Sequence, residues 1–334
     1  MKPALLIRLR PTTPWRIGPG TGARNQAGAV LHSDTWYSAV CQAMAQFQML
    51  EEWLNATARP FAEPAVRFSS LFPFQRGMLY APPPAGIWPP PQSGRVRWKG
   101  AKLAPLGAIG TLLRGETLDE ERWIVDGHSG CLLPSTGYAG VGPFRQLRRR
   151  FAAVDRLTGG LAEPYEAAAV QFAPGCGLWG LMEFANPTAY AVWAPKIEIA
   201  LRWLADSGVG GLRSRGFGRA RQPEFTAGTL EQLLEPLPAP RSGNPAWWLL
   251  SLFSPGEEDQ VDWSAGSYGL LTRTGRAVNG AVKTGARLVE EGSVLVAATS
   301  PRGSIRDAAP EGAAHPVYRA GYALALPIDW GTAA

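Results

Sequence analysis

The stretch GVGGLRSRGFGRARQPEF, residues 208–225, constrains the fold more than any other, because it alternates glycine with arginine between two ordered elements. Before it, Ile197, Leu201 and Leu204 lie on one face of a helix that Pro195 is suited to begin. After it, the chain has the composition of a strand. The stretch is therefore predicted to be a loop that connects a helix to a strand.

The order of these elements argues against a nucleotide-binding loop. Gly208 is suited to end the helix, because glycine readily adopts the left-handed conformation of a helix C-terminus. A Rossmann glycine loop follows a strand and opens a helix, which is the reverse order, and a Walker A loop needs a lysine that this stretch lacks. We interpret the glycines as positions that let backbone N–H groups approach a longer anion.

The side chains of the loop favour RNA as that anion. Arg213 and Arg215 would place two guanidiniums on one side of an extended chain, and Phe217 would offer a flat surface to a base. A second basic cluster, RQLRRR, begins at Arg145. One groove could be lined by both clusters together with Arg8, Arg10, Arg16 and Arg24. The competing interpretation is a set of solvated surface loops.

The overall charge agrees with a nucleic-acid partner. The chain of 334 residues has a formal charge of +6 and a pI of about 9.4, and only five of its 33 basic residues are lysine. Arginine binds phosphate bidentately and stacks on bases, so this bias favours nucleic acid. An arginine-rich proteome from a GC-rich genome would produce the same bias, but it would not explain where the arginines cluster.

Two further patterns predict the first half of the fold. Residues 4–10 alternate as a half-buried strand, with Leu5, Ile7 and Leu9 inward and Leu6, Arg8 and Arg10 exposed. Residues 31–54 are predicted to be a helix with Ser33 or Asp34 as its N-cap. Its buried stripe would be Trp36, Val40, Ala43, Phe47 and Leu50. Strand, helix, insertion, helix and strand follow the order of a βαββαβ, ferredoxin-like unit.

These elements divide the chain into two predicted domains of an α+β protein. Residues 1–235 form the first, with an insertion at about 59–190 that includes the Pro-rich residues 59–145 and short strands near 95–100 and 122–127. Residues 154–160, VDRLTGG, would begin a hairpin whose return strand is YEAAAVQFA. Residues 236–334 form a second domain, ferredoxin-like or mostly β.

Several classes of protein are disfavoured by what the sequence lacks. Three distant cysteines without a CxxC pair indicate free thiols in a reducing compartment. There is no leader-like segment and no apolar run long enough for a membrane span, so we expect a cytoplasmic protein without a membrane partner. His128 and Cys131 alone do not make a zinc site, and no catalytic motif is present. We therefore expect neither metal nor cofactor.

Five segments carry a resemblance that spans nearly the whole chain. They are LHSDTWYSAVCQA (31–43), VDRLTGG (154–160), GLRSRGFGR (211–219), EEGSVLV (290–296) and HPVYRAGYAL (315–324). Together they resemble the RAMP superfamily of CRISPR proteins, and most closely the fourth Csm subunit of type III-A effector complexes. The sequence departs from the family pattern in its long Pro-rich segment and in Trp36.

The resemblance implies two ferredoxin-like, RRM-related domains and a subunit without catalytic activity. Such a subunit binds the 5′ handle of CRISPR RNA (crRNA) and contacts both the large polymerase-like subunit and a backbone RAMP subunit. A hairpin would reach the target RNA near the first guide positions, and residues 154–160 would supply it. The RNA-binding residues expected from pattern and resemblance together are Arg10, Arg16, Arg24, His32, Ser33, Asp34, Thr35, Arg148, Arg149, Arg150, Asp155, Arg156, Gly210, Gly211, Arg213, Ser214, Arg215, Gly216, Phe217, Gly218, Arg219 and Lys283.

Two other functions stay open at this point. A RAMP-fold endoribonuclease that processes CRISPR RNA without metal would need a general base and a cation, for which His32 with Lys283 or Arg16 is the best set. A standalone RNA-binding regulator would bind RNA tightly without partner subunits.

Overall fold

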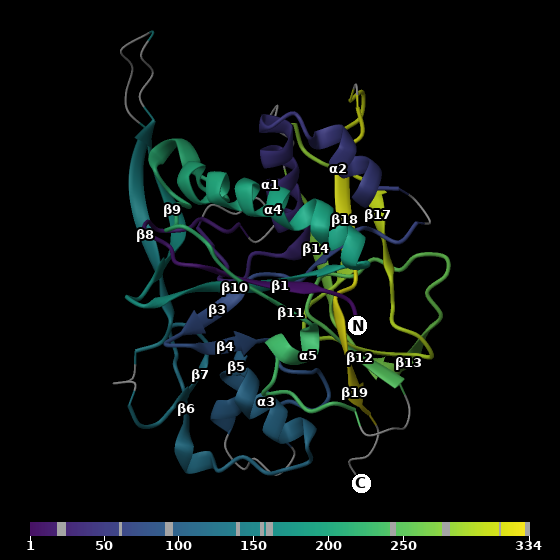
Figure 1. The fold of residues 1–334 in the computed structure, drawn as a ribbon. Coiled ribbons are helices and arrows are strands. Elements are labelled where there is room, and N and C mark those ends of the chain that lie inside the picture. The colour runs from purple at the N-terminus through teal and green to yellow at the C-terminus, as the bar shows by residue number, and fades with distance from the viewer. Residues whose placement is uncertain are drawn as a thin grey trace.

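The computed structural model describes residues 1–18, 25–59, 62–90, 96–137, 141–153, 157, 163–240, 245–275, 281–313 and 315–330 (Figure 1). It is a mixed α+β fold, as predicted. The helices are α1 (Ser33–Gln46), α2 (Leu50–Thr57), α3 (Leu106–Leu113), α4 (Pro187–Ser207) and α5 (Leu230–Leu233). The 3-10 helices are η1 (Val96–Gly100), η2 (Glu120–Arg122) and η3 (Arg213–Arg215).

A central antiparallel sheet organises the first part of the chain. Its strands are β1 (Ala4–Leu9), β2 (Val66–Phe68), β3 (Phe72–Gln75), β4 (Met78–Ala81), β5 (Ala104–Pro105), β10 (Cys176–Phe184) and β11 (Glu224–Gly228). They run in the order β11–β1–β10–β3–β4–β5, and β2 also pairs with β10. Because α1 follows β1 and α4 follows β10, this is the strand and helix order of a βαββαβ unit.

The Pro-rich segment contributes directly to this sheet. Strands β2 and β3 lie beside β10, so the residues expected as an insertion supply central strands. The strand predicted near residues 95–100 is wrong, because that segment forms η1. The strand predicted near residue 124 is confirmed as β6 (Trp123–Val125), which pairs with β7 (Leu132–Pro134).

The last part of the chain consists of strands. A four-stranded sheet has the order β13 (Val261–Ser267), β16 (Val294–Ala297), β12 (Pro245–Leu249) and β19 (Ala325–Asp329). Two ladders accompany it, β14 (Leu270–Arg273) with β15 (Ala286–Val289) and β17 (Gly303–Asp307) with β18 (Tyr318–Tyr322). No helix occurs in the described residues from 245 onward, where the elements are all strands.

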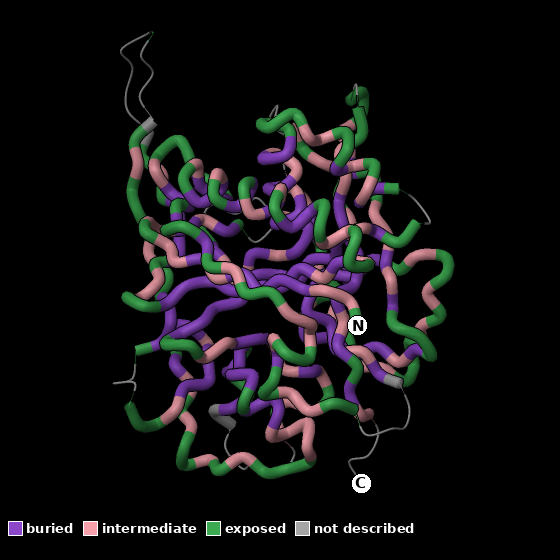
Figure 2. Tube along the Cα trace, in the orientation of Figure 1, coloured by how far each residue is buried: buried purple, intermediate pink, exposed green. Residues whose placement is uncertain are grey.

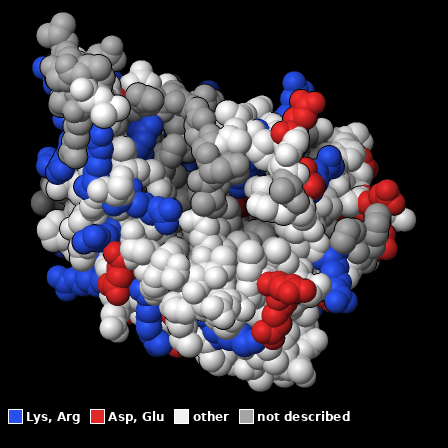
Figure 3. All heavy atoms as spheres, turned by 90° about the horizontal axis from the view of Figure 1, so that it is seen from above, with Lys and Arg blue, Asp and Glu red and all other residues white. Residues whose placement is uncertain are grey.

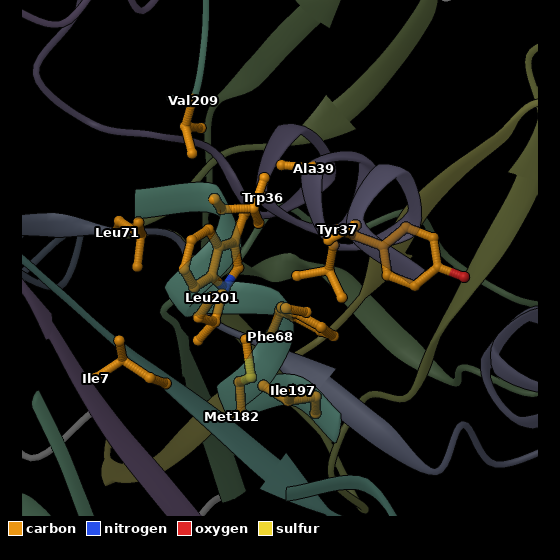
Figure 4. Packing of buried hydrophobic residues seen from close by; sticks show 14 of the residues in the cluster. Ile7, Trp36, Tyr37, Ala39, Phe68, Leu71, Met182, Ile197, Leu201 and Val209 are labelled. Carbon is orange, nitrogen blue, oxygen red and sulfur yellow. The ribbon is translucent and has the colours of Figure 1, made fainter. Parts of the chain in front are cut away.

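Helices α1 and α4 cover one face of the central sheet, and Trp36 of α1 is buried between them and the strands (Figure 4). The predicted stripe is confirmed at Trp36, Val40 and Ala43. It is wrong at Phe47, which is 37% exposed, because α1 ends one residue earlier and Gln48 turns the chain with a φ of 60°. The N-cap is His32, and it makes no side-chain cap bond.

The opposite face of the central sheet is buried as well (Figure 2). Leu6 was expected to be exposed, yet it is only 3% exposed and belongs to a cluster with Trp179 and Trp248. Trp248 lies on β12, so strands from the last part of the chain cover the face that a half-buried strand would leave open. Both faces of β1 are therefore core, which explains why its sequence is so apolar.

Helix α4 begins earlier than its proline suggested. Asn186 caps it by accepting a hydrogen bond from the Ala189 N–H, and Pro187 occupies the first turn. Pro195 lies inside the helix, so the predicted start is wrong. The buried face of Ile197, Leu201 and Leu204 is confirmed, as is the end at Gly208, which has a φ of 90°.

A long hairpin projects beside this body, at the left in Figure 1. Its strands β8 (Phe144–Ala153) and β9 (Glu163–Phe172) pair in an unbroken register. The basic cluster RQLRRR lies within β8, whereas the sequence placed it before the hairpin. Residues 154–160 lie outside the described residues except for Leu157.

Candidate nucleic-acid interface

The glycine-rich loop that follows α4 is shaped by positions that only glycine accommodates. A Cβ at Gly218 would lie 2.1 Å from the Val209 carbonyl oxygen, and one at Gly210 would lie 2.6 Å from the Arg16 carbonyl oxygen. Both glycines have positive φ. The Gly211 N–H donates to the Arg16 carbonyl at 2.9 Å, so the loop is fixed against the segment that follows β1.

Arg213 and Arg215 do not share one side of an extended chain. They begin and end the 3-10 helix η3, which has three residues per turn, so side chains two residues apart point in different directions. Both are exposed, as is Ser214 between them. The extended conformation expected for this segment is therefore wrong.

A cleft of about 710 Å³ lies between α1, the glycine-rich loop, β14 and β18. It brings together a third of the residues expected to bind RNA, drawn from four separate segments of the chain. These are Arg16, Asp34, Thr35, Gly210, Gly211, Arg213 and Lys283. Among the described lining residues five are cationic and only Asp34 is acidic, so the cleft has the electrostatic character of an anion-binding site.

The acidic residue of the cleft is neutralised by two arginines that the sequence analysis missed. Arg273 donates to Asp34 from Nε at 3.2 Å and from Nη2 at 3.0 Å, and Arg319 donates from Nη1 at 2.7 Å. All three side chains are about 95% buried. We call this group the clamp, because it joins the start of α1 to β14 and β18.

The charges of the clamp set the protonation of its members. Burial alone would raise the pKa of Asp34, but Arg273, His32 and Arg319 lower that pKa to about 2. Burial lowers the pKa of the nearby Lys283, and the charge of Arg319 lowers it further. One carboxylate faces three cations here, so positive charge is in excess on the cleft floor.

The residues before Asp34 also join the two parts of the chain. Ser33 accepts a hydrogen bond from the Leu252 N–H at 3.0 Å. His32 Nδ1 lies 2.9 Å from Glu291 Oε1, and Ser70 Oγ donates to the same carboxylate oxygen. Although burial would raise the pKa of Glu291, these two partners hold it below the usual value. His32 is not among the residues that line the cleft, unlike Arg16 and Lys283.

The hairpin presents the second basic surface. Arg148, Arg149 and Arg150 are exposed on β8, and Arg150 pairs with Glu166 on the neighbouring strand at 2.9 Å. Seen from above, Lys and Arg gather on the hairpin side of the molecule and in its central hollow, whereas most Asp and Glu lie on the other side (Figure 3). Arg24, Asp155 and Arg156 lie outside the described residues.

The other residues expected to bind RNA lie outside both the cleft and the basic face of the hairpin. Phe217 is only 3% exposed and packs behind the loop, so its ring is not presented to a base. Arg10 is occupied by Glu224, with Nε 2.6 Å from Oε1, and the pKa of that carboxyl is lowered by this hydrogen bond. Arg219 is exposed, while Gly216 and Gly218 provide the turns on either side of Phe217.

The described residues contain no cluster of three or more His, Cys, Asp or Glu side chains that could hold a metal ion. None of the helices in the described part of the chain is both long and apolar enough to cross a membrane. The three cysteines are free thiols, as the sequence predicted.

Known proteins resemble this chain in its C-terminal sequence and in its overall fold. Residues 242–328 match the model of the CRISPR Csm4 C-terminal domain. A chain of the Csm3-Csm4 subcomplex of the type III-A CRISPR-Cas interference complex aligns with a TM-score of 0.66 at 14% identity, covering 97% of this chain and 99% of that one.

Chains of a Csm1-Csm4 cassette show the same fold. With pppApA bound, the TM-score is 0.59 at 17% identity over 99% of both chains. With AMPPNP bound, it is 0.58 at 17% identity over 98% and 99%. A search of curated protein sequences gave no match. Residues 242–328 are thus similar to the Csm4 C-terminal domain, and the whole chain shares the fold of these chains from Csm1-Csm4 and Csm3-Csm4 complexes.

Proposed function

We propose that this chain is a non-catalytic subunit of a type III-A CRISPR interference complex and that it binds the 5′ handle of crRNA in the cytoplasm. The observation that carries the proposal is the cleft, where Arg16, Arg213 and Lys283 lie around a carboxylate that Arg273 and Arg319 already neutralise. A ligand for such a site must be anionic, and single-stranded RNA supplies phosphates at regular intervals.

The dimensions of the basic surface favour a polymer over a small molecule. The cleft lies next to the hairpin, because Arg16 lines the cleft and also contacts β9. Its backbone pairs with Gly211, and its Nη1 donates at 2.7 Å to the carbonyl of Ala168, which lies opposite Arg148 of β8. A bound strand would follow this path from the cleft toward the hairpin, where it would meet target RNA at the first guide positions.

The partner subunits are proposed from the relatives. The similar chains were crystallised as Csm1-Csm4 and Csm3-Csm4 complexes. We propose that this chain likewise bridges a large polymerase-like subunit and a backbone RAMP subunit. Such a bridging role agrees with a cleft that lies between the two parts of the chain, where it can be completed by a neighbouring subunit.

The test begins with RNA recovered from the protein purified from its native host. We expect RNAs that share one short 5′ sequence. A synthetic copy is then titrated by fluorescence anisotropy at several salt concentrations. Replacing Arg213 and Lys283 by alanine should lower the slope of log K against log[salt] by about 1.4, since each lost phosphate contact removes about 0.7.

Arg122→Ala is the matched control, because Arg122 is 81% exposed, carries the same charge and does not line the cleft. It should leave the slope unchanged. An unchanged slope in the Arg213 and Lys283 variant would overturn the proposal. Specific cleavage of the RNA that is lost in His32→Ala would instead favour the endoribonuclease.

A further inference from the structure

We propose that Arg215 is a positioning residue that fixes the direction of the β8–β9 hairpin, and that, unlike Arg213, it is not a phosphate ligand. This inference rests on the proposed function, because it concerns how the glycine-rich loop and the hairpin act together on RNA. It assigns different roles to two arginines that lie two residues apart in the sequence.

Arg215 lies over a pair of aromatic rings on the hairpin. Its Cζ is 4.7 Å from the centroid of Phe151 and 5.4 Å from that of Tyr165. The two rings face each other across β8 and β9, with centroids 5.5 Å apart and planes at 25°. A planar guanidinium over aromatic faces is a favourable cation–π arrangement. The face of the Arg215 guanidinium that could stack on an RNA base is therefore already stacked on the hairpin rings.

A second contact runs in the opposite direction between the same two elements. Phe217 from the loop packs 6.1 Å from Phe151, and Cζ of Arg149 on β8 lies 5.5 Å from the Phe217 centroid. Each element thus contributes one arginine and at least one ring. We call these five residues the brace: Arg149, Phe151, Tyr165, Arg215 and Phe217.

The brace holds the hairpin far from its base. At the base, Trp15 and Val170 exchange backbone hydrogen bonds of 2.8 and 2.7 Å, and Phe144 packs on Phe172. From Phe144 to Phe151 a strand rises about 24 Å at roughly 3.4 Å per residue. Between the base and the brace, Arg16 Nη1 donates to the Ala168 carbonyl, and residues 167–170 of β9 are buried. Beyond this buried stretch a two-stranded ribbon has little stability of its own, so the brace sets the direction of the outer part of the hairpin.

The loop can act as a support because its backbone is fixed. The Val209 N–H donates to the Gly218 carbonyl at 3.0 Å, and the Gly218 N–H donates to the Pro14 carbonyl at 3.0 Å. Within this frame η3 turns Arg213 toward the cleft and Arg215 toward the hairpin. RNA bound by Arg213 would therefore contact the same rigid turn, η3, whose Arg215 supports the hairpin.

Pulsed electron–electron spin resonance on the full chain tests this arrangement. Spin labels are attached at Ala152→Cys near the end of β8 and at Val192→Cys on α4, both exposed, with Cys41 replaced by serine. The distance distribution should be narrow in the parent and at least twofold broader in Arg215→Ala. Phe151→Leu should broaden it equally, although it removes no charge. Arg219→Ala, which removes a charge from the same loop outside the brace, should leave it narrow.

Salt titration of RNA binding separates positioning from ligation. The slope should be the same for the parent, Arg215→Ala and Arg215→Lys, whereas Arg213→Ala should lower it by about 0.7. A fall of that size in Arg215→Ala, with a distance distribution that stays narrow, would overturn the inference and leave the proposed function intact. An unchanged slope in Arg213→Ala would count against the proposed function instead.

Discussion

The two basic regions of this molecule use arginine in opposite ways. In the clamp, Arg273 and Arg319 are about 95% buried and share the carboxylate of Asp34. On the hairpin, Arg148 and Arg150 are exposed, and Arg150 forms an ion pair with Glu166 although its side chain is 86% exposed. The burial of a charge and the position of its counter-charge therefore distinguish an arginine that builds the site from one that is available to a ligand.

The largest effect is expected when the clamp loses its carboxylate. Asp34→Asn would leave two buried guanidiniums without a counter-charge, which costs about 3–5 kcal/mol of unfolding free energy. Urea unfolding at neutral pH measures this loss. Arg150→Gln, which removes an exposed pair, should change the unfolding free energy by less than about 0.5 kcal/mol. Similar values for the two variants would remove the distinction between the regions.

The pH dependence of stability gives a smaller and separate effect. The pKa of Asp34 is about 2 in the folded chain against 3.8 ordinarily. Because the pKa of Asp34 is lower in the folded chain than in the unfolded chain, this carboxylate stabilises the fold at any pH above the unfolded pKa. The stabilisation is lost as the pH falls from about 4 to 2. The difference amounts to about 2 kcal/mol. The unfolding free energies of the parent and Asp34→Asn should therefore converge by this amount over that interval, and parallel curves would contradict the assignment.

Substitution of the exposed hairpin arginines should leave the stability of the fold unchanged and should weaken RNA binding measurably. Arg148 and Arg150 lie two residues apart on β8 and so project from the same face. Replacing both by glutamine should leave thermal unfolding unchanged. The salt slope for RNA binding should fall by about 1.4, if each contacts one phosphate. A lower melting temperature with an unchanged salt slope would indicate that these arginines, like those of the clamp, stabilise the fold and do not bind RNA.

Local patterns predicted the elements that depend on neighbouring residues. The strand in residues 4–10, the helical spacing around Trp36 and the glycine at the end of α4 follow from local geometry, and the structure confirms them. The predicted alternation of buried and exposed residues in that strand is wrong, because both of its faces are buried. The predictions at Pro195 and Phe47 are wrong, because α4 already begins at the Asn186 cap with Pro187 in its first turn and because the chain turns at Gln48 just after α1. The Pro-rich segment has no period, so its place beside β10 could not be predicted.

The candidate site was predicted in its glycine-rich loop and missed in its clamp. Arg273 and Arg319 lie on short strands with no motif around them, and they meet Asp34 across 239 and 285 residues. The only local signal is a charged side chain within an otherwise apolar strand such as YRAGY. The split between Arg213 and Arg215 was also missed, because spacing alone does not distinguish an extended segment from a 3-10 turn.

The clamp has a consequence for how the protein is made. Arg319 leaves the ribosome 285 residues after Asp34. At about 5–20 residues per second this interval is roughly 15–60 s. During that time the Asp34 carboxylate lacks at least one of its two arginine partners, because Arg273 follows it by 239 residues and Arg319 by 285. The cleft is complete only once translation has passed β18, so a nascent chain that exposes its glycine-rich loop earlier does not yet have the anion-binding cleft that we propose for RNA.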